Sequence, residues 1–169
     1  MEYLIISYAT VGSAYEQCIQ RQHEQHGKRF RGFVFPDQGS WAENTKLKVR
    51  AIREGLKQAD CVLWVDADCT VDPPEELPAG DWDIGIVDNI HPTHKNRISA
   101  GFILFRNTPA THRMLAYWEM RQQNTVTDHG ALTMALKESR RATIINISDW
   151  LEGRHSINEL LPERGKYVG

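Results

Sequence analysis

Two aspartates separated by one alanine are the residues of this sequence best placed to do chemistry. Asp66 and Asp68 directly follow an apolar run, Cys61–Val65, that has the composition of a buried strand. Alternate side chains of an extended strand point to the same side, so we expect both carboxylates to face one point. Carboxylate oxygens are preferred ligands of Mg²⁺ and Mn²⁺. The pattern therefore predicts a divalent-metal site; the simpler alternative is a strand end with two solvated acids.

The helical segment before this strand has a lysine on its apolar face. Lys48, Ile52 and Leu56 are spaced at i, i+4 and i+8, so their side chains share one side of a helix. If that side packs on a sheet, the Lys48 ammonium group needs an anion, either a carboxylate or a phosphate group of a ligand. The alternative is that the lysine extends past the apolar stripe and places its amino group in solvent. The sequence leaves these arrangements open.

The elements that must position these residues alternate between strands and helices. Strands are predicted at 3–8, 30–35, 61–65, 82–87, 99–105 and 143–147, and helices at 14–26, 42–57, 109–122 and 128–138. Thr108, followed by a proline, and Thr127 are residue types that begin helices. Ser156 and Glu159 have the spacing of a capping box for a small C-terminal helix. This order is typical of an α/β domain with a mostly parallel central sheet flanked by helices.

Length and composition narrow the class of protein. A chain of 169 residues fits one domain, which should bury roughly 70% of its unfolded surface. The net charge of −2 gives no electrostatic basis for binding nucleic acids or membranes non-specifically. Cys18, Cys61 and Cys69 form no even disulfide set, and the first apolar run is too short for a signal sequence or a membrane span. We therefore expect a cytoplasmic protein without a membrane span.

Three ordered motifs resemble the nucleotide-diphospho-sugar glycosyltransferases of the GT-A fold, particularly the smaller relatives of galactosyltransferases and glycogenin-like enzymes. The helix of Lys48 and the strand that ends in the aspartates resemble the family's lysine helix and DxD motif. The segment that begins at Ser99 resembles its asparagine-alanine-glycine strand, and the segment that begins at Asp128 resembles a later acidic motif opening a helix. The resemblance implies one GT-A domain over 1–169, with a nucleotide-binding half at about 1–70 and a donor-sugar and acceptor half at about 81–169.

The resemblance also implies a metal site that contains the two aspartates. Asp66 would contact the ribose and the coordination shell of the metal, Asp68 would bind Mn²⁺ or Mg²⁺ directly, and His155 would be a third ligand. A divalent cation and a lysine stabilise the negative charge that develops on a departing nucleotide diphosphate. For His155 the alternative is a surface histidine, with water or phosphate oxygens completing the coordination.

The nucleotide and the donor sugar would be bound by residues at several strand ends. The resemblance implies contacts from Tyr8, Ala9, Thr10, Lys48, Asp66, Arg97, Ser99, Ala100, Gly101 and His129. Tyr8 either stacks on a pyrimidine base or packs against a neighbouring strand. Ser99 stands where the family usually has asparagine, and His129 where it usually has glutamine, so the sugar is not identified. A UDP-sugar is the expected donor.

Asp128 is the candidate catalytic residue. In an inverting enzyme its carboxylate would remove the proton of the acceptor hydroxyl group. In a retaining enzyme it would support the oxocarbenium-like sugar or position the donor and the acceptor. The alternative is a first-turn aspartate that interacts favourably with the helix dipole. The sequence does not distinguish these roles.

Two other functions are consistent with the same aspartates. In a haloacid-dehalogenase-like phosphatase, Asp66 would attack phosphorus and Asp68 would act as general acid and base, with Mg²⁺. That fold needs a later lysine and an acidic pair on successive strands; Asp81 and Asp83 come too soon, and no later acidic pair supplies the motif. Its nucleophile also normally follows the first strand of the core. A GT-A-like module that binds a nucleotide without turnover is the second alternative. The acceptor is unknown, and we expect a homo-oligomer or a large acceptor to complete its site.

Overall fold

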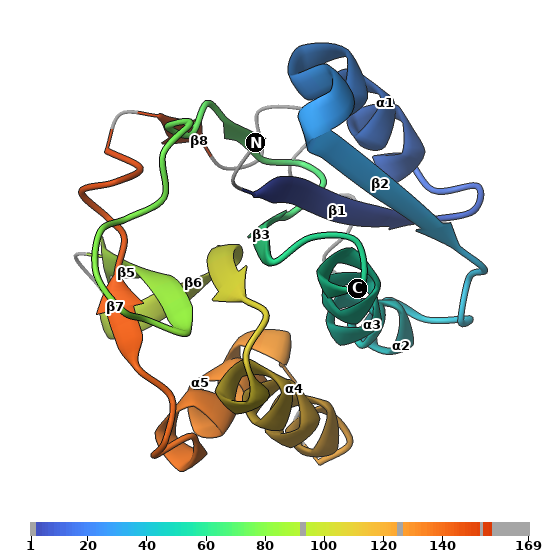
Figure 1. Cartoon of the computed structure of the whole chain (residues 1–169). Helices are drawn as coiled ribbons and strands as arrows, with labels where there is room; N and C mark the ends of the chain where they lie inside the picture. The colour runs from blue at the N-terminus through green and yellow to red at the C-terminus, as the bar shows by residue number, and fades with distance from the viewer. Residues whose placement is uncertain (1–2, 92–93, 125–126, 153, 157–169) are drawn as a thin grey trace.

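A six-stranded sheet forms the centre of the protein (Figure 1). The computed structural model describes residues 3–91, 94–124, 127–152 and 154–156, with the backbone alone for 89–91, 94–97 and 155–156. The strands of this sheet are β1 (Leu4–Thr10), β2 (Phe30–Phe35), β3 (Cys61–Val65), β5 (Ile84–His91), β6 (His94–Arg106) and β7 (Ile144–Asn146). A separate antiparallel pair consists of β4 (Thr70–Val71) and β8 (His155–Ser156).

The order of the strands creates a crevice at one edge of the sheet. The order is β2-β1-β3-β6-β5-β7, with β1 parallel to β2 and β3, and β5 parallel to β7. β6 is antiparallel to both of its neighbours, β3 and β5, so the sheet is mostly parallel, as predicted. Because β2 and β3 lie on opposite sides of β1, the strand order reverses at β1, and a crevice is expected beyond the carboxyl ends of β1 and β3.

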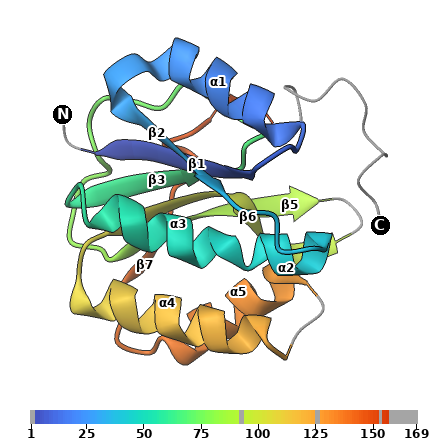
Figure 2. The ribbon, with the colours of Figure 1, turned by 90° about the vertical axis from the view of Figure 1, so that its right-hand side faces the viewer.

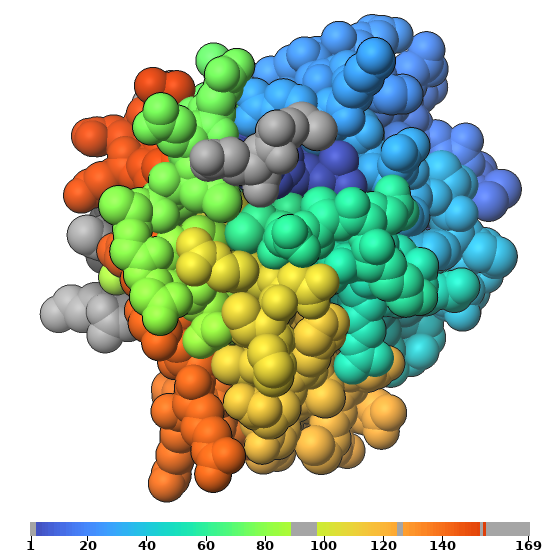
Figure 3. Space-filling model, in the orientation of Figure 1, coloured from blue at the N-terminus to red at the C-terminus, as the bar shows by residue number. Residues whose placement is uncertain are grey.

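Helices cover both faces of the sheet. They are α1 (Tyr15–His26) with the short 3-10 turn η1 (Gly27–Arg29), α2 (Trp41–Thr45), α3 (Leu47–Leu56), α4 (Pro109–Gln122) and α5 (Asp128–Glu138). Figure 2 shows α1 on one face and the other helices on the opposite face. In the space-filling view, the teal α3 segment lies between the blue N-terminal segments and the yellow segment that leads into α4 (Figure 3). No described helix is long and apolar enough to cross a membrane.

The core is divided by the sheet into two clusters, and β3 contributes to both. Trp64 belongs to the cluster that α3, α4 and α5 cover, whereas Leu63 belongs to the cluster on the side of α1. All five residues of β3 are buried. A central strand that is buried on both faces is expected to be continuously apolar, which is why the sequence Cys61–Val65 predicts this strand at its observed bounds.

The predicted bounds are also confirmed for β2, α4 and α5, but the predicted helix at 42–57 is wrong in one respect. It is two helices, α2 and α3, that meet at Lys46. Ser40 begins α2, because its hydroxyl oxygen accepts a hydrogen bond from the Glu43 amide at 3.2 Å. The Thr45 hydroxyl donates to the Ala42 carbonyl at 2.8 Å, a local bond that competes with regular helix.

Two further predictions of local structure are corrected. Residues 91 and 94–97 lie between the predicted strands 82–87 and 99–105, yet they belong to β5 and β6, in which His91 pairs with His94, so β6 begins well before the predicted residue 99. A ladder of backbone hydrogen bonds does not need apolar side chains, so this polar segment lacks the apolar pattern from which strands are predicted. Ser156, predicted to begin a helix, pairs with Thr70 in the small sheet; the remainder of that predicted helix lies outside the described residues.

Candidate active site

A cleft of about 560 Å³ opens at the carboxyl ends of β1 and β3. Its walls come from the segment after β1, from α2 and the start of α3, from the segment after β3, from β6 and from the start of α5. The predicted site residues that line it are Tyr8, Ala9, Thr10, Lys48, Asp66, Asp68, Ala100, Asp128 and His129. Residues distant in the sequence are therefore brought together at the crevice that the strand order creates.

Lys48 lies at the centre of an ion-pair cluster. Its ammonium nitrogen is 3.0 Å from Asp66 Oδ1 and 2.8 Å from Asp128 Oδ2, and it donates a hydrogen bond to the Ala100 carbonyl at 3.2 Å. The lysine side chain is 8% exposed. Burial lowers the pKa of Lys48, but the charges of Asp128 and then Asp66 raise it, and the net pKa is above its ordinary value. Of the arrangements that the sequence leaves open, the structure shows the lysine paired with carboxylates. We call Lys48, Asp66 and Asp128 the inner cluster.

Tryptophan and glutamine side chains complete the hydrogen bonding of the inner cluster. The indole Nε1 of Trp64 donates to Asp66 Oδ1 at 3.1 Å. Trp118 Nε1 and Gln122 Nε2, both from α4, donate to Asp128 Oδ1 at 3.1 and 2.9 Å. Asp128 is the first residue of α5, as predicted, but its carboxylate contacts side chains of other elements. These contacts fix both carboxylates at the base of the cleft.

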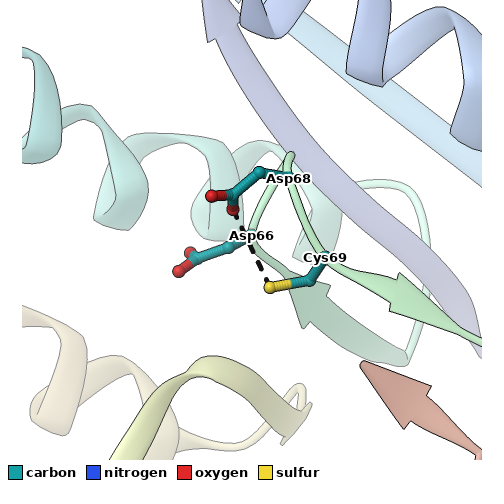
Figure 4. Close-up of side chains that lie close together, drawn as sticks. All are labelled: Asp66, Asp68 and Cys69. Carbon is teal, nitrogen blue, oxygen red and sulfur yellow. Dashed lines mark hydrogen bonds between the residues drawn. The ribbon is translucent and has the colours of Figure 1, made fainter. Parts of the chain in front are cut away.

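The two aspartates lie on a turn, so the predicted extended strand end is wrong. The Cys69 amide donates to the Asp66 carbonyl at 2.9 Å, which closes a turn over residues 66–69. The turn nevertheless brings one ligand atom each of Asp66, Asp68 and Cys69 within 4.8 Å of one another. Figure 4 shows the two carboxylates projecting to the same side of the turn. The 66–69 turn therefore achieves the proximity expected from strand alternation by a different backbone geometry.

The chemistry of the 66–69 turn fits a divalent cation. Burial and the negative charge of Asp66 raise the pKa of Asp68. Such a shift means that the folded protein resists placing two negative charges side by side. A divalent cation such as Mg²⁺ or Mn²⁺ prefers oxygen ligands, and its positive charge would offset the repulsion between the two carboxylates. The Cys69 sulfur, 3.8 Å from Asp68 Oδ1, is a neighbour that sequence reasoning did not connect with the site.

Tyr8 packs against its neighbours in the structure. Its ring centroid is 5.9 Å from that of Phe35 and 5.7 Å from that of Trp64. Its hydroxyl group donates to the Asn44 carbonyl at 2.6 Å, which ties β1 to α2. Burial raises the pKa of this hydroxyl group. The structure thus shows the packing arrangement that the sequence left open, with one edge of the residue in the cleft wall.

Two of the predicted sugar contacts lie behind the 66–69 turn instead of in the cleft wall. The Ser99 hydroxyl accepts a hydrogen bond from the Gly101 amide at 3.2 Å, and the Gly101 carbonyl accepts from the Asp66 amide at 2.9 Å. A Cβ atom on Gly101 would lie 3.5 Å from Asp66 Oδ2. These residues therefore support Asp66 from behind. The side chains of Arg97 and His155 lie outside the described part of the chain.

Several residues that hold the site were not found by sequence reasoning. Trp118 is a fully buried residue of α4, and its indole group donates a hydrogen bond to Asp128. The spacing of Trp118 and Gln122, i and i+4 on one helix face, is a signal that they act on the same neighbour. Gln22 of α1 donates to backbone carbonyls of the 66–69 turn. No pattern around Gln22 connects it with that turn, which lies far along the sequence.

Comparison with known proteins gives matches in structure alone. No protein-family model matches the sequence, and no curated protein matches it either. The fold is similar to a glycosyltransferase involved in glycosylation of the major capsid of PBCV-1, with a TM-score of 0.67 and 12% identity over 85% of this chain and 80% of that chain. It is also similar to a mutant of Drosophila β-1,4-galactosyltransferase 7 in complex with manganese, UDP-Gal and xylobiose, with a TM-score of 0.61 and 12% identity over 93% of this chain and 71% of that chain.

These similarities establish the fold. The chain is an α/β domain with the fold of glycosyltransferases, which confirms the GT-A architecture that the three motifs imply. At this level of sequence identity the likeness concerns the arrangement of strands and helices. The chemistry of the cleft has to be argued from the residues of this chain.

Proposed function

We propose that this chain is a metal-dependent glycosyltransferase that moves a sugar from a nucleotide diphosphate, a UDP-sugar, to an acceptor hydroxyl group. The observation that carries the proposal is a cleft in which Asp66 and Asp128 pair with a buried lysine and Asp68 lies beside Asp66. The cleft lies at the crevice of a fold shared with glycosyltransferases, one of them solved with manganese and UDP-Gal. Its volume of about 560 Å³ is in the range of small-molecule sites.

The 66–69 turn would hold Mn²⁺ or Mg²⁺. Lys48 and Trp64 bind Asp66 Oδ1, so we assign Asp66 Oδ2 and the carboxylate of Asp68 to the ion. When bound, the ion supplies Lewis-acid stabilisation of the negative charge on a departing diphosphate. We retain His155 as a further ligand, because its backbone pairs with Val71, three residues after Asp68. Water or phosphate oxygens would fill the remaining positions.

The inner cluster would orient the reacting groups. Lys48 holds Asp66 and Asp128 in place, so we assign it to positioning of these carboxylates more than to direct binding of phosphate. Three donors already bind the oxygens of Asp128. We therefore assign Asp128 to orienting and stabilising the donor sugar and favour this role over removal of the acceptor proton.

The test is turnover of nucleotide sugars by matched variants. Purified wild-type protein with Mn²⁺ is expected to hydrolyse or transfer sugar from a UDP-sugar, and Asp68→Ala is expected to reduce kcat/KM by roughly 100-fold or more, since metal stabilisation contributes several kcal/mol. Asp72→Ala is the control, because Asp72 is an exposed aspartate of the next segment that does not line the cleft. Equal turnover by Asp68→Ala and wild type would exclude the proposed metal role.

The same assay separates the two alternative functions. Hydrolysis of simple phosphomonoesters that is lost in Asp66→Asn would indicate a phosphatase with Asp66 as nucleophile. A rise in melting temperature with UDP and Mn²⁺, but no product from any nucleotide sugar, would indicate a binding module. The proposal requires product formation that depends on the metal.

A further inference from the structure

The 66–69 turn is held from behind by one buried amide. Gln22 of α1 is 1% exposed, and its Nε2 lies 3.2, 2.9 and 3.2 Å from the carbonyl oxygens of Asp66, Ala67 and Cys69. An amide nitrogen has only two hydrogens, so the three carbonyls share them. A single side chain thus gathers three carbonyls of the turn that carries the acidic pair.

The orientation and chemistry of this amide indicate a specific purpose. If the amide were reversed, its oxygen would face three carbonyl oxygens, so the donor orientation is fixed. Oε1 is then buried, and among the described residues it has no hydrogen-bond partner. A buried acceptor without a partner is destabilising. Core packing alone therefore does not favour glutamine here, whereas the converging carbonyls of the turn require a donor with this geometry.

Gln22 and two backbone hydrogen bonds hold different groups of the turn. The Asp66 amide is fixed to the Gly101 carbonyl at 2.9 Å, and the Cys69 amide to the Asp66 carbonyl. Gln22 adds the Ala67 and Cys69 carbonyls to this set, on both sides of Asp68. A turn that brings two carboxylates together against their repulsion needs such support to keep them at ligand spacing.

We propose that Gln22 is a positioning residue that preorganises the 66–69 turn for its divalent cation. The inference rests on the proposed function, in which this turn binds the metal. Groups that orient metal ligands without touching the ion commonly change metal affinity 10- to 100-fold when they are replaced. Gln22 would act in this way through the backbone of the turn and would itself contact neither the ion nor the substrate.

The same helix provides a matched control. Gln25 Nε2 donates to the Val71 carbonyl at 3.0 Å, in β4 and beyond the 66–69 turn. Gln25→Met removes a side-chain amide donor of α1 that binds the backbone, as Gln22→Met does, but the bond that it removes lies outside the turn. Methionine keeps an unbranched side chain of similar length in both variants. Gln22→Asn is a second test variant, which retains an amide one methylene too short to reach the same carbonyls.

The experiment measures Mn²⁺ affinity by calorimetry and the spectrum of bound Mn²⁺ by electron paramagnetic resonance, well below the melting temperature of each variant. We expect Gln22→Met and Gln22→Asn to weaken Mn²⁺ binding by about 10- to 100-fold and to change the spectrum, and Gln25→Met to match wild type. If Gln22→Met does not fold, Gln22→Asn provides the comparison.

The outcomes separate this inference from the proposed function. Wild-type affinity and spectrum in folded Gln22 variants would overturn the positioning role and leave the metal site intact. An equal loss in Gln25→Met would also overturn it, because the effect would then belong to α1 as a whole. Absence of Mn²⁺ binding by the wild-type protein would instead contradict the metal site on which the proposed function depends.

Discussion

The inner cluster and the 66–69 turn hold negative charge in opposite ways. In the inner cluster, Lys48 lies between Asp66 and Asp128, and indole and amide donors bind the same carboxylates. In the turn, Asp68 lies beside Asp66, and burial together with this like charge raises the pKa of Asp68. The first region therefore supplies its own counter-charge, whereas the charge distribution of the second suits a cation that comes from outside.

Because of this difference, we expect the inner cluster to contribute mainly to stability and the acidic pair of the turn mainly to function. Removing one member of a buried ion-pair cluster leaves charges without compensation and is strongly destabilising. Removing a carboxylate from a repelling pair relieves the repulsion in the folded protein but takes away a proposed metal ligand. Sites that are arranged for a ligand commonly reduce the stability of the ligand-free protein. Asp66 belongs to both regions, so the cluster fixes the position of one side of the proposed metal site.

The largest effect is expected from Lys48→Met. The variant leaves Asp66 and Asp128 without their shared cation, in a site where Asp128 is only 10% exposed. We expect the free energy of unfolding to fall by about 3–5 kcal/mol, and Tm to fall by about 6–20 °C. Urea denaturation followed by circular dichroism measures the first quantity, and calorimetry the second.

Lys57→Met is the matched control for this prediction. Lys57 follows the same helix and pairs with Glu54 at 2.7 Å, but its side chain is 69% exposed. An exposed pair of this kind contributes less than about 1 kcal/mol, so the control should remain close to wild type. If both variants lost a similar free energy of unfolding, the buried ion pairs of the inner cluster would contribute no more to stability than an exposed pair.

A smaller loss is expected from Asp128→Asn. Lys48 keeps Asp66 and the Ala100 carbonyl as partners, and the new amide oxygen can still accept from Trp118. We expect destabilisation of about 1–3 kcal/mol by urea denaturation, the range for loss of a buried hydrogen-bonded group. The double variant with Lys48→Met should lose less than the sum of the two single losses, by about 0.5–3 kcal/mol. Additive losses would contradict a coupled cluster.

The sequence was most informative where local patterns decide the structure. The continuous apolar run of β3 and the threonine caps of α4 and α5 predict these elements at their observed bounds. For Lys48 on an apolar helix face the pattern offers a buried ammonium group paired with an anion as one of two arrangements, and the structure shows that one. In each case the residues that set the structure lie within a few positions of one another.

The sequence was least informative where distant segments meet. The strand extension of β6 depends on pairing with β5, and the turn over 66–69 depends on Gly101 and Gln22, so no local pattern reveals either. The identity of the Lys48 partners and the indole bond to Asp128 likewise come from tertiary packing. The motifs predicted several of the residues that line the cleft, and the contacts between them came from the fold.

The smallest effect, and the one of opposite sign, is expected from Asp68→Asn in metal-free protein. Burial and Asp66 raise the pKa of Asp68 above its ordinary value of 3.8, so the folded state binds this proton more tightly than the unfolded state. The resulting stabilisation is fully present below pH 3.8 and is lost as the pH rises through the raised pKa of the folded protein. Asparagine does not titrate, so the variant keeps the stability that the wild type loses as the pH rises.

We therefore expect Asp68→Asn and wild type to have similar stability at acidic pH, and the variant to be more stable near neutral pH by about 0.5 kcal/mol or less. Calorimetry across this pH range with EDTA measures the difference, with Asp72→Asn as the exposed control. Added Mn²⁺ should reverse the order, because only the wild type retains both carboxylates of the turn and gains stability from binding. A variant that is less stable than wild type at neutral pH in EDTA would contradict the contrast between the two regions, since the folded protein would then favour the charged form of Asp68.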